Sequence, residues 1–584
     1  MTPCRNFPIS RRTFFSASAA LGAALATGTR PARAARKPNV ILVMTDDQGY
    51  GDLSCHGNPH LKTPNLDRLH GESTRLTDFH VSPTCAPSRA AIMTGRHNNR
   101  VGVWHTIMGR SILQRDERTM ADYFNAAGYR TGIFGKWHLG DNYPYRPQDR
   151  GFQEVLVHGG GGVGQTPDFW GNNYIDDTYF HNGTPKPFAG YCTDVWFDGA
   201  MQFIEENRDA PFFCYLPTNA PHHPYIVPPE FSAPFKDAGM KDDPANFYGM
   251  LANFDQNMGR LLGQLDALQL ADNTIFIFMT DNGTAAGDGG GMRGAKGSEY
   301  EGGHRVPCFI RWPGGGIRAN ADLPMLTSQT DLLPTLLELC GLKASAARPF
   351  DGISLKPWLA EPNTPEPDRA IVVDSQRIEL PEKWRKSAVL EKDWRLVNGE
   401  ELYDLTSDPE QKNNVASAHP DRVTRMREIY DAWWESISPA FDDFCPLVIG
   451  AMGQGPSQLN AHDWHVEQAQ IPWHQKHILQ GLKGNGFWAI DVAEDGEYQF
   501  DLRRWPLETD APINAAIDGG TALAISEARI AIAGLEQSKP VNPEDRHARF
   551  TLKLNKGETR LNTTFTGNNN EERGAYYCIV ERVS

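Results

Sequence analysis

Two groups of oxygen-bearing side chains each follow a strongly apolar segment. One apolar run covers residues 40–44 and the other covers residues 274–279. Such runs are typical of strands buried on both faces of a parallel sheet, and ligand sites in open α/β sheets lie at the carboxyl ends of strands. The residues that follow the two runs are Asp46, Asp47, Asp281 and Asn282. This all-oxygen set suits Ca²⁺ or Mg²⁺ and argues against zinc or copper, although Asp and Asn are also common in ordinary strand-end turns.

A reactive cysteine and several basic residues lie between these two groups or close to them. Cys85 begins the sequence Cys-Ala-Pro-Ser-Arg, which ends at Arg89. Lys136 and His138 follow a short apolar run two residues apart, so an extended backbone would project both from one face. Two further basic residues in glycine- or proline-containing turns are His222 and Lys296. A single lysine or histidine in such a place is usually structural. A functional role is therefore inferred from the whole set of residues and not from any one of them.

The segment that begins at Cys85 resembles the signature of the sulfatase family, C-x-P-S-R, in which a separate enzyme oxidises the cysteine to formylglycine. The two strand-end groups and the segments 135–140, 220–224, 294–297 and 301–307 also match sulfatase motifs in order and type. A thiolate attacking sulfur would leave a stable thiosulfate ester. A hydrated aldehyde avoids this outcome, because one hydroxyl attacks sulfur and deprotonation of the other expels sulfate.

The resemblance implies a role for each residue. Arg89 and Lys136 would fix the hydrated aldehyde and, with Lys296, neutralise charge on the sulfuryl oxygens. His222 would protonate the leaving alkoxide, and His138 would deprotonate the remaining hydroxyl. Calcium, with Mg²⁺ as the alternative, would be held by Asp46, Asp47, Asp281 and Asn282.

A glycine-containing loop over residues 158–173 carries aromatic and amide side chains that suit a sugar ring. We expect this loop to be a mobile lid beside the pocket, with ordinary loop packing as the alternative. The expected substrate-pocket residues are Trp104, His105, Asp168 and Trp170.

Composition limits the choice of partner. The net charge of −15 and the absence of a basic stripe in the sequence argue against nucleic acid. We expect a sulfated carbohydrate or an aryl sulfate as substrate, and a formylglycine-generating enzyme as maturation partner.

Two alternatives remain open: a phosphonate monoester or phosphodiester hydrolase of the same superfamily, and a non-catalytic polysaccharide-binding protein if Cys85 is not converted.

The N-terminal residues 1–35 resemble a bacterial twin-arginine export signal. Arg11 and Arg12 precede a weakly apolar stretch over residues 16–28, and small residues follow. The stretch is too short to span a membrane. We therefore expect the export machinery as a partner, a periplasmic or secreted location, and no membrane attachment after cleavage.

Alternating apolar and helical segments predict an α/β fold. We expect a mainly parallel sheet with helices on both faces over residues 36–365. The resemblance implies that this domain has an alkaline-phosphatase-like fold. The resemblance also implies a small antiparallel C-terminal subdomain over residues 366–440, where it ends.

The rest of the chain has a different pattern. Residues 441–475 lack periodicity and are expected to form a linker or a wrapping segment. Alternating apolar residues predict an all-β sandwich over residues 476–584, which either packs or binds sugars. Within it, Arg503, Arg504 and Trp505 are expected to be an exposed patch or a strand edge.

Overall fold

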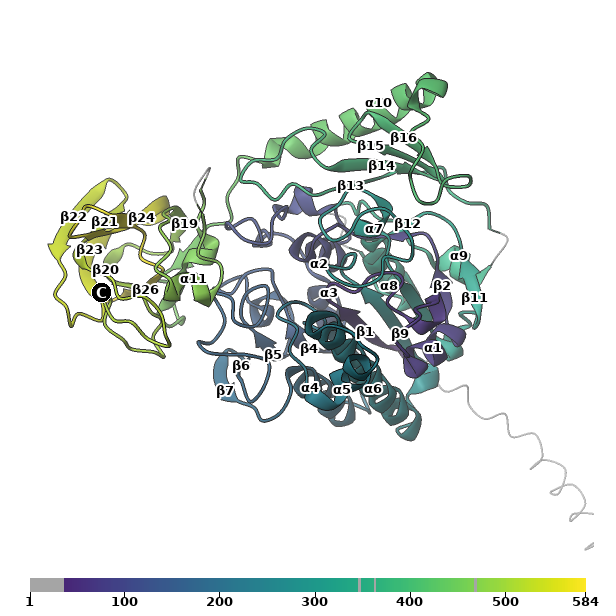
Figure 1. The fold of residues 1–584 in the computed structure, drawn as a ribbon, viewed down its shortest axis with the longest axis horizontal. Helices are drawn as coiled ribbons and strands as arrows, with labels where there is room; N and C mark the ends of the chain where they lie inside the picture. Colours follow the sequence, from purple (N-terminus) through teal and green to yellow (C-terminus); the bar gives the residue numbers. More distant parts are fainter. Residues whose placement is uncertain (1–35, 345–347, 362–363, 467–469) are drawn as a thin grey trace, which may run out of the picture. The chain divides into compact units, whose positions relative to one another are not determined.

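The strand that precedes Asp46 and Asp47 lies in the middle of a ten-stranded sheet (Figure 1). The computed structural model describes residues 36–344, 348–361, 364–466 and 470–584, so the expected export signal lies outside the described residues. The strands in spatial order are β11 (Ala321–Leu323), β2 (Thr74–Leu76), β10 (Cys308–Arg311), β9 (Thr274–Thr280), β1 (Asn39–Thr45), β8 (Phe212–Pro217), β4 (Arg130–Lys136), β5 (Glu154–His158), β6 (Thr178–His181) and β7 (Thr184–Pro187). The five central strands, β9 to β5, are mutually parallel, as predicted, whereas β10 and β6 run antiparallel to their neighbours.

Helices cover both faces of this sheet because alternate residues of β1 point to opposite sides. Val40, Leu42 and Met44 face one hydrophobic cluster, and Ile41 and Val43 face the other. The first face is covered by α2 (Cys85–Thr94), α3 (Met120–Ala126) and α8 (Leu332–Leu339). The second is covered by α1 (Pro64–Gly71), α4 (Cys192–Glu206) and α6 (Asp242–Ala267).

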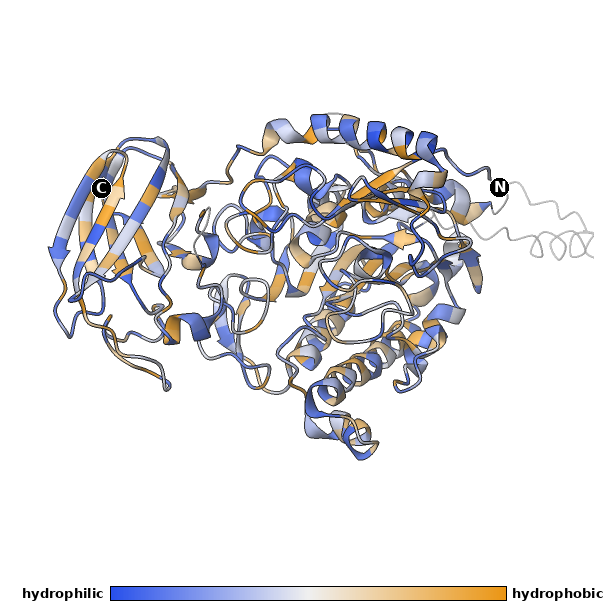
Figure 2. Ribbon diagram, turned by 45° about the horizontal axis from the view of Figure 1, so that its top comes forward, coloured by the Kyte–Doolittle hydropathy of each residue, from blue (hydrophilic) through white to orange (hydrophobic). Residues whose placement is uncertain are grey.

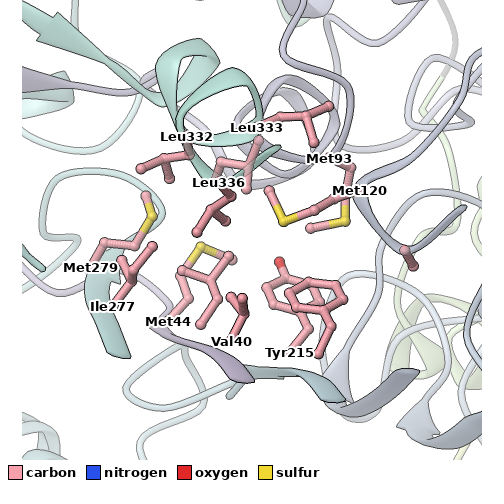
Figure 3. Close-up of a cluster of buried hydrophobic side chains, with 14 of the residues drawn as sticks. Val40, Met44, Met93, Met120, Tyr215, Ile277, Met279, Leu332, Leu333 and Leu336 are labelled. Atoms are coloured by element: carbon pink, nitrogen blue, oxygen red, sulfur yellow. The ribbon is translucent and has the colours of Figure 1, made fainter. Parts of the chain in front are cut away.

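The helix that begins at Cys85 is held on the sheet by its apolar C-terminal half. Figure 3 shows Met93 of α2 beside Met120, with Leu332 and Leu336 of α8 above Met44 of the sheet. Every residue of α2 is buried. This packing fixes the helix axis, and with it the position of residue 85 at the N-terminal end.

A four-stranded antiparallel sheet and a helix follow, as predicted. The sheet contains β13 (Ile371–Asp374), β14 (Ser387–Glu391), β15 (Trp394–Val397) and β16 (Glu401–Asp404). The helix α10 (Pro420–Ile437) packs one apolar side, including Met426 and Tyr430, on Val389 and Leu402.

The C-terminal part is a sandwich of two further sheets, and its strands alternate in hydropathy in Figure 2. One sheet is formed by β17 (Leu447–Ile449), β19 (Phe487–Val492), β24 (Gly557–Gly567), β21 (Ile525–Ile532) and β22 (Leu535–Pro540), with β25 (Glu572–Arg573) on β24. The other is formed by β18 (Ser457–Asn460), β26 (Tyr577–Arg582), β20 (Gly496–Arg503) and β23 (Ala548–Leu554). Their shared core contains Trp464 and Trp488, together with Ile112 and Tyr145 from the α/β part.

Two expectations about this region are wrong. Residues 441–475 are not simply a linker, because β17 and β18 lie within them and pair with β19 and β26. These strands are too short to show a period, and their partners are distant in sequence. The expected exposed patch is also wrong, because Arg504 and Trp505 are fully buried and the Arg504 guanidinium donates hydrogen bonds to backbone carbonyls. No helix in the described residues is long and apolar enough to cross a bilayer.

Candidate functional site

The two strand ends bring the four predicted metal ligands together. Strands β1 and β9 pair in register through Thr45 and Thr280, so the residues that follow them are neighbours. The Asp47 backbone N–H donates to Asp281 Oδ1 at 3.2 Å. Asn282 Nδ2 donates to Asp47 Oδ1 at 2.8 Å. A left-handed backbone at Asp47, with φ of 68°, turns its side chain into this group.

These side chains fit a hard cation. All four are buried, and Asp46 Oδ1 and Asn282 Oδ1 have no hydrogen-bond partner in the described parts of the chain. A buried oxygen without a partner costs about 1–3 kcal/mol, so these atoms are suited to bind a positive group. Burial and the neighbouring Asp46 carboxylate raise the pKa of Asp281 to about 7. The donor set therefore matches Ca²⁺ or Mg²⁺.

Three basic side chains surround the carboxylates. The Arg89 guanidinium contacts Asp281 Oδ2 at 2.8 Å, and Lys136 Nζ contacts Asp46 Oδ2 at 2.5 Å. Lys296 Nζ is 2.6 Å from one oxygen of Asp47. Burial opposes ionisation of Asp46, but the Lys136 ammonium holds its pKa well below the usual range. The charges of the three carboxylates and the three basic side chains cancel. A bound divalent cation would therefore give the site the net positive charge that an anionic ester requires.

Cys85 is the first residue of α2 and is 3% exposed. Its sulfur lies within 4.8 Å of carboxylate oxygens of Asp46 and Asp281. Proline at position 87 is tolerated because the first helical turn leaves its N–H groups unpaired in any case. The positive end of the helix dipole favours a developing negative charge at residue 85. One turn later, Arg89 reaches the same carboxylates.

His138 reaches the site by a different route from the one predicted. Lys136 ends β4, and His138 has a left-handed backbone with φ of 61°, so the two are not projected by one extended strand. His138 Nε2 donates to the Thr106 carbonyl at 2.8 Å, because a carbonyl only accepts. Nδ1 therefore carries the lone pair, and it is buried without a partner in the described structure. Burial and Lys136 hold the pKa of His138 well below 6.5, so it is a neutral base.

His222 lies in the loop after β8. Its Nδ1 donates to the His223 carbonyl at 2.6 Å, and its Nε2 is 3.9 Å from Asp47 Oδ2. Burial and the Lys296 ammonium lower the pKa of His222 to about 4. His222 is therefore neutral at pH 7 and must take up a proton before it can donate one.

The loop after β5 lies against both histidines. A Cβ on Gly161 would come within 2.3 Å of His138 Cε1, and one on Gly162 would lie 3.5 Å from His222 Cε1. Glycine at residue 161 is thus required by the close approach of the imidazole. This contact was not apparent from the sequence, where the glycine run indicated only a loop.

The same loop is tied to the C-terminal sandwich region. The Thr166 N–H donates to the Trp473 carbonyl at 3.0 Å, and the Tyr577 hydroxyl donates to the Thr166 carbonyl at 3.0 Å. Gln475 Nε2 donates to the Asp168 carbonyl at 3.1 Å. These bonds make it an anchored wall, which does not fit the expectation of a mobile lid.

Each of the four expected substrate-pocket residues has packing or hydrogen-bond partners within the protein. Trp104 is buried against Phe441 and donates from Nε1 to the Ile378 carbonyl. Trp170 donates from Nε1 to Asp518 in the C-terminal part. His105 is 5% exposed and accepts a hydrogen bond from the neighbouring backbone. Asp168 accepts from two backbone N–H groups of the glycine loop, so its position organises that loop.

Sequence reasoning did not identify a contribution from the C-terminal region. The His462 ring centroid is 6.2 Å from that of His138, and the Met108 N–H donates to the His462 carbonyl at 2.9 Å. His462 Nε2 is buried without a partner among the described residues. No local sequence signal marks His462, because only long-range packing brings it here.

Comparison with known proteins gives consistent results. The family model described as Sulfatase matches residues 38–342. An N-acetylgalactosamine-6-O-sulfatase of Bacteroides thetaiotaomicron is 29% identical, covering 68% of this chain and 93% of the relative. Arylsulfatase A of Homo sapiens is 34% identical, covering 56% of this chain and 68% of the relative. Among solved structures, Ps i-CgsB in complex with k-i-k-neocarrahexaose has a TM-score of 0.63 and 30% identity, covering 70% of this chain and 95% of that one.

Proposed function

The chain belongs to the sulfatase family and is a sulfuric ester hydrolase, and from this premise we propose that it hydrolyses sulfate monoesters of carbohydrates. In this proposal the nucleophile is a formylglycine derived from Cys85, and the cofactor is Ca²⁺. The observation that carries the proposal is the meeting of Cys85 with buried carboxylates, the buried Arg89 and Lys136, and the half-buried Lys296 at one sheet edge.

The substrate class rests on what similar proteins act on or bind. One relative is named an N-acetylgalactosamine-6-O-sulfatase, and one Ps i-CgsB structure is a complex with k-i-k-neocarrahexaose. Both point to sulfated sugars. An aryl sulfate is then the simpler synthetic substrate for assays.

Calcium is favoured over magnesium by the burial of the ligand set. Asp46, Asp281 and Asn282 are fully buried and Asp47 is 2% exposed, which leaves little room for bound water. Mg²⁺ loses its water reluctantly and usually keeps several water ligands, whereas Ca²⁺ accepts protein carboxylates in flexible geometries. When bound, the cation would polarise a sulfuryl oxygen and offset its negative charge.

The remaining steps fall to groups of the chain itself. The guanidinium of Arg89 and the ammonium groups of Lys136 and Lys296 hold the anionic ester in place and stabilise charge that develops on its oxygens. The lone pair on His138 Nδ1 accepts a proton within the site. An aldehyde at residue 85, once hydrated, would supply a hydroxyl nucleophile that the thiol cannot replace.

His222 supplies the proton for the leaving alkoxide in this scheme. Because its pKa is about 4 in the structure, it must be protonated when the anionic ester binds nearby and favours the charged imidazolium.

Maturation and location are part of the same proposal. A formylglycine-generating enzyme would modify Cys85, and residues 1–35 would direct the protein to the periplasm or outside a bacterial cell.

Release of inorganic sulfate tests the function. Matured protein should release sulfate from sulfated galactosamine or carrageenan oligosaccharides and from 4-nitrophenyl sulfate. Turnover of a phosphonate monoester should be slower. Faster turnover of the phosphonate would favour the phosphonate hydrolase alternative, and absence of all turnover in matured protein would favour a binding protein.

Substitution of His222 tests its role as general acid. In His222→Ala, hydrolysis of sugar sulfates should fall by about 10²–10⁴-fold, because an alkoxide needs a proton to leave. Hydrolysis of 4-nitrophenyl sulfate should fall much less, because nitrophenolate is a good leaving group. The exposed neighbour His223 provides the matched control, since His223→Ala retains the carbonyl that accepts from His222. Equal losses on both substrates would contradict the assignment.

A further inference from the structure

A cleft separate from the catalytic residues lies between the α/β part and the C-terminal sandwich. Its volume is about 580 Å³, which is within the usual range of small-molecule sites, about 300–1,000 Å³. One side is formed by residues from 141–148, 155–158 and 166–169 of the α/β part, and the other by residues from 454–460 and 506–508 with Tyr577. The family model ends at residue 342, so the second side lies outside the matched region.

The cleft wall combines apolar surfaces with amide groups. Apolar contact surface comes from Tyr143, Phe169 and Leu507, and the Leu507 side chain is 41% exposed. Five amide side chains line the wall: Asn142, Gln148, Gln454, Gln458 and Asn460. Aromatic faces and amides together are suited to a sugar, whose ring presents apolar C–H faces and a rim of hydroxyl groups.

One buried polar atom in this wall lacks a partner. His158 ends β5, lines the cleft and is 1% exposed. Its Nδ1 donates to the Gly159 carbonyl at 2.9 Å, so Nε2 carries the lone pair. Nε2 has no hydrogen-bond partner within the described part of the chain. His158 is the register partner of Lys136 in the pairing of β4 with β5, so the cleft wall and the catalytic group meet at this residue.

In the part of the chain that the structure describes, the cleft offers no free cation to offset the charge of a sulfated ring. Arg146 is the only lysine or arginine among the described residues that line it, and its guanidinium is bonded to Asp149 and Gln454. The carboxyl groups of Asp141, Asp168 and Glu508 also line the cleft, and each accepts a backbone N–H. An added anion would face these carboxyl groups without a free cation. The cleft is therefore suited to a neutral ring.

We propose that this cleft is a binding site for an unsulfated sugar residue, formed jointly by the α/β part and the C-terminal sandwich. The assignment of the sugar to the substrate polymer rests on the proposed function, whereas sugar binding as such does not. The glycine loop joins the two sites, because His158 lies in the cleft and Gly161 contacts His138. A polymer held in the cleft would remain close to the catalytic residues between turnovers.

A cleft-filling substitution tests this site without removing an existing contact. Gly455 lines the cleft, is exposed and does not have positive φ, and a Cβ added to it would have no atom within 4 Å. Gly455→Trp should therefore fold normally and block the cleft. Gly263, which is exposed on α6 and equally open, provides the matched control Gly263→Trp.

The direct readout is calorimetric titration of the full-length protein with two uncharged hexasaccharides, desulfated κ-carrageenan and neoagarohexaose. We expect at least one to bind, and we expect Gly455→Trp to weaken that binding by about tenfold or more, while Gly263→Trp leaves it unchanged. Absence of binding by both, or equal binding in Gly455→Trp, would overturn the proposal.

A kinetic readout connects the cleft with turnover. Gly455→Trp should raise KM for a sulfated hexasaccharide and leave kcat/KM for 4-nitrophenyl sulfate unchanged. An equal loss on both substrates would overturn the proposal by showing a general defect. Failure of the proposed function would give a different pattern, in which unsulfated sugar binds but no sulfate is released.

Discussion

Replacement of Cys85 by alanine is expected to reduce sulfate release by on the order of 10⁴-fold or more, which is the scale of losing a covalent nucleophile. Alanine removes the atom that becomes the aldehyde and leaves the helix N-terminus unchanged. The small cavity from one lost sulfur should have little effect on folding. Sulfate release by Cys85→Ala and by the parent protein is compared on 4-nitrophenyl sulfate and on a sulfated oligosaccharide. Both proteins are produced together with a maturation enzyme.

A second cysteine separates this effect from general thiol chemistry. Cys55 is half-buried on the other side of the sheet, in contact with the cluster around α1. Cys55→Ala should therefore retain turnover. Comparable turnover in Cys85→Ala and the parent protein would exclude residue 85 as the source of the nucleophile.

Removal of the divalent cation is expected to reduce turnover by about 10³-fold or more, because the site then lacks its net positive charge. It should also lower the Tm. A ligand present at 100 times its Kd stabilises the folded state by about 2.7 kcal/mol, which corresponds to about 2 °C in a protein of this size. Calcium should restore both properties after chelation, and magnesium should restore them less well.

The variant Asp281→Asn gives this prediction a sharper form. It removes one carboxylate of the ligand set and leaves the buried Arg89 guanidinium without this charge partner, so the Tm without cation should be lower than that of the parent protein. The increase in Tm on adding calcium should be lost. The fully exposed Asp209 provides a matched control, because Asp209→Asn should keep the calcium response. Full activity after exhaustive chelation would contradict the assignment of Asp46, Asp47, Asp281 and Asn282.

The central sheet and the carboxylate group were predictable because local pattern and long-range structure agree. Residues 40–44 and 275–279 are apolar without interruption, which is typical of a strand covered on both faces. Polar residues placed directly after such strands meet wherever the strands are parallel neighbours. The register of Thr45 with Thr280 then brings the two acidic groups together.

The surroundings of the two histidines were not predictable in the same way. The turn at His138 depends on a left-handed backbone, which alternation of residues does not reveal. The contact with His462 joins residues that are far apart in sequence. The strands β17 and β18 contain only 3 and 4 residues, so their pairing, and not their sequence pattern, defines them.

Peptide mass spectrometry of residue 85 tests the central claim most directly. Protein from the native host, or made together with a maturation enzyme, should yield a peptide containing residue 85 that is about 18 Da lighter than the cysteine form, because CH₂SH has become CHO. The aldehyde should also react with a hydrazine probe. A peptide from the native host with the intact thiol, in a preparation that releases sulfate, would contradict the proposed nucleophile.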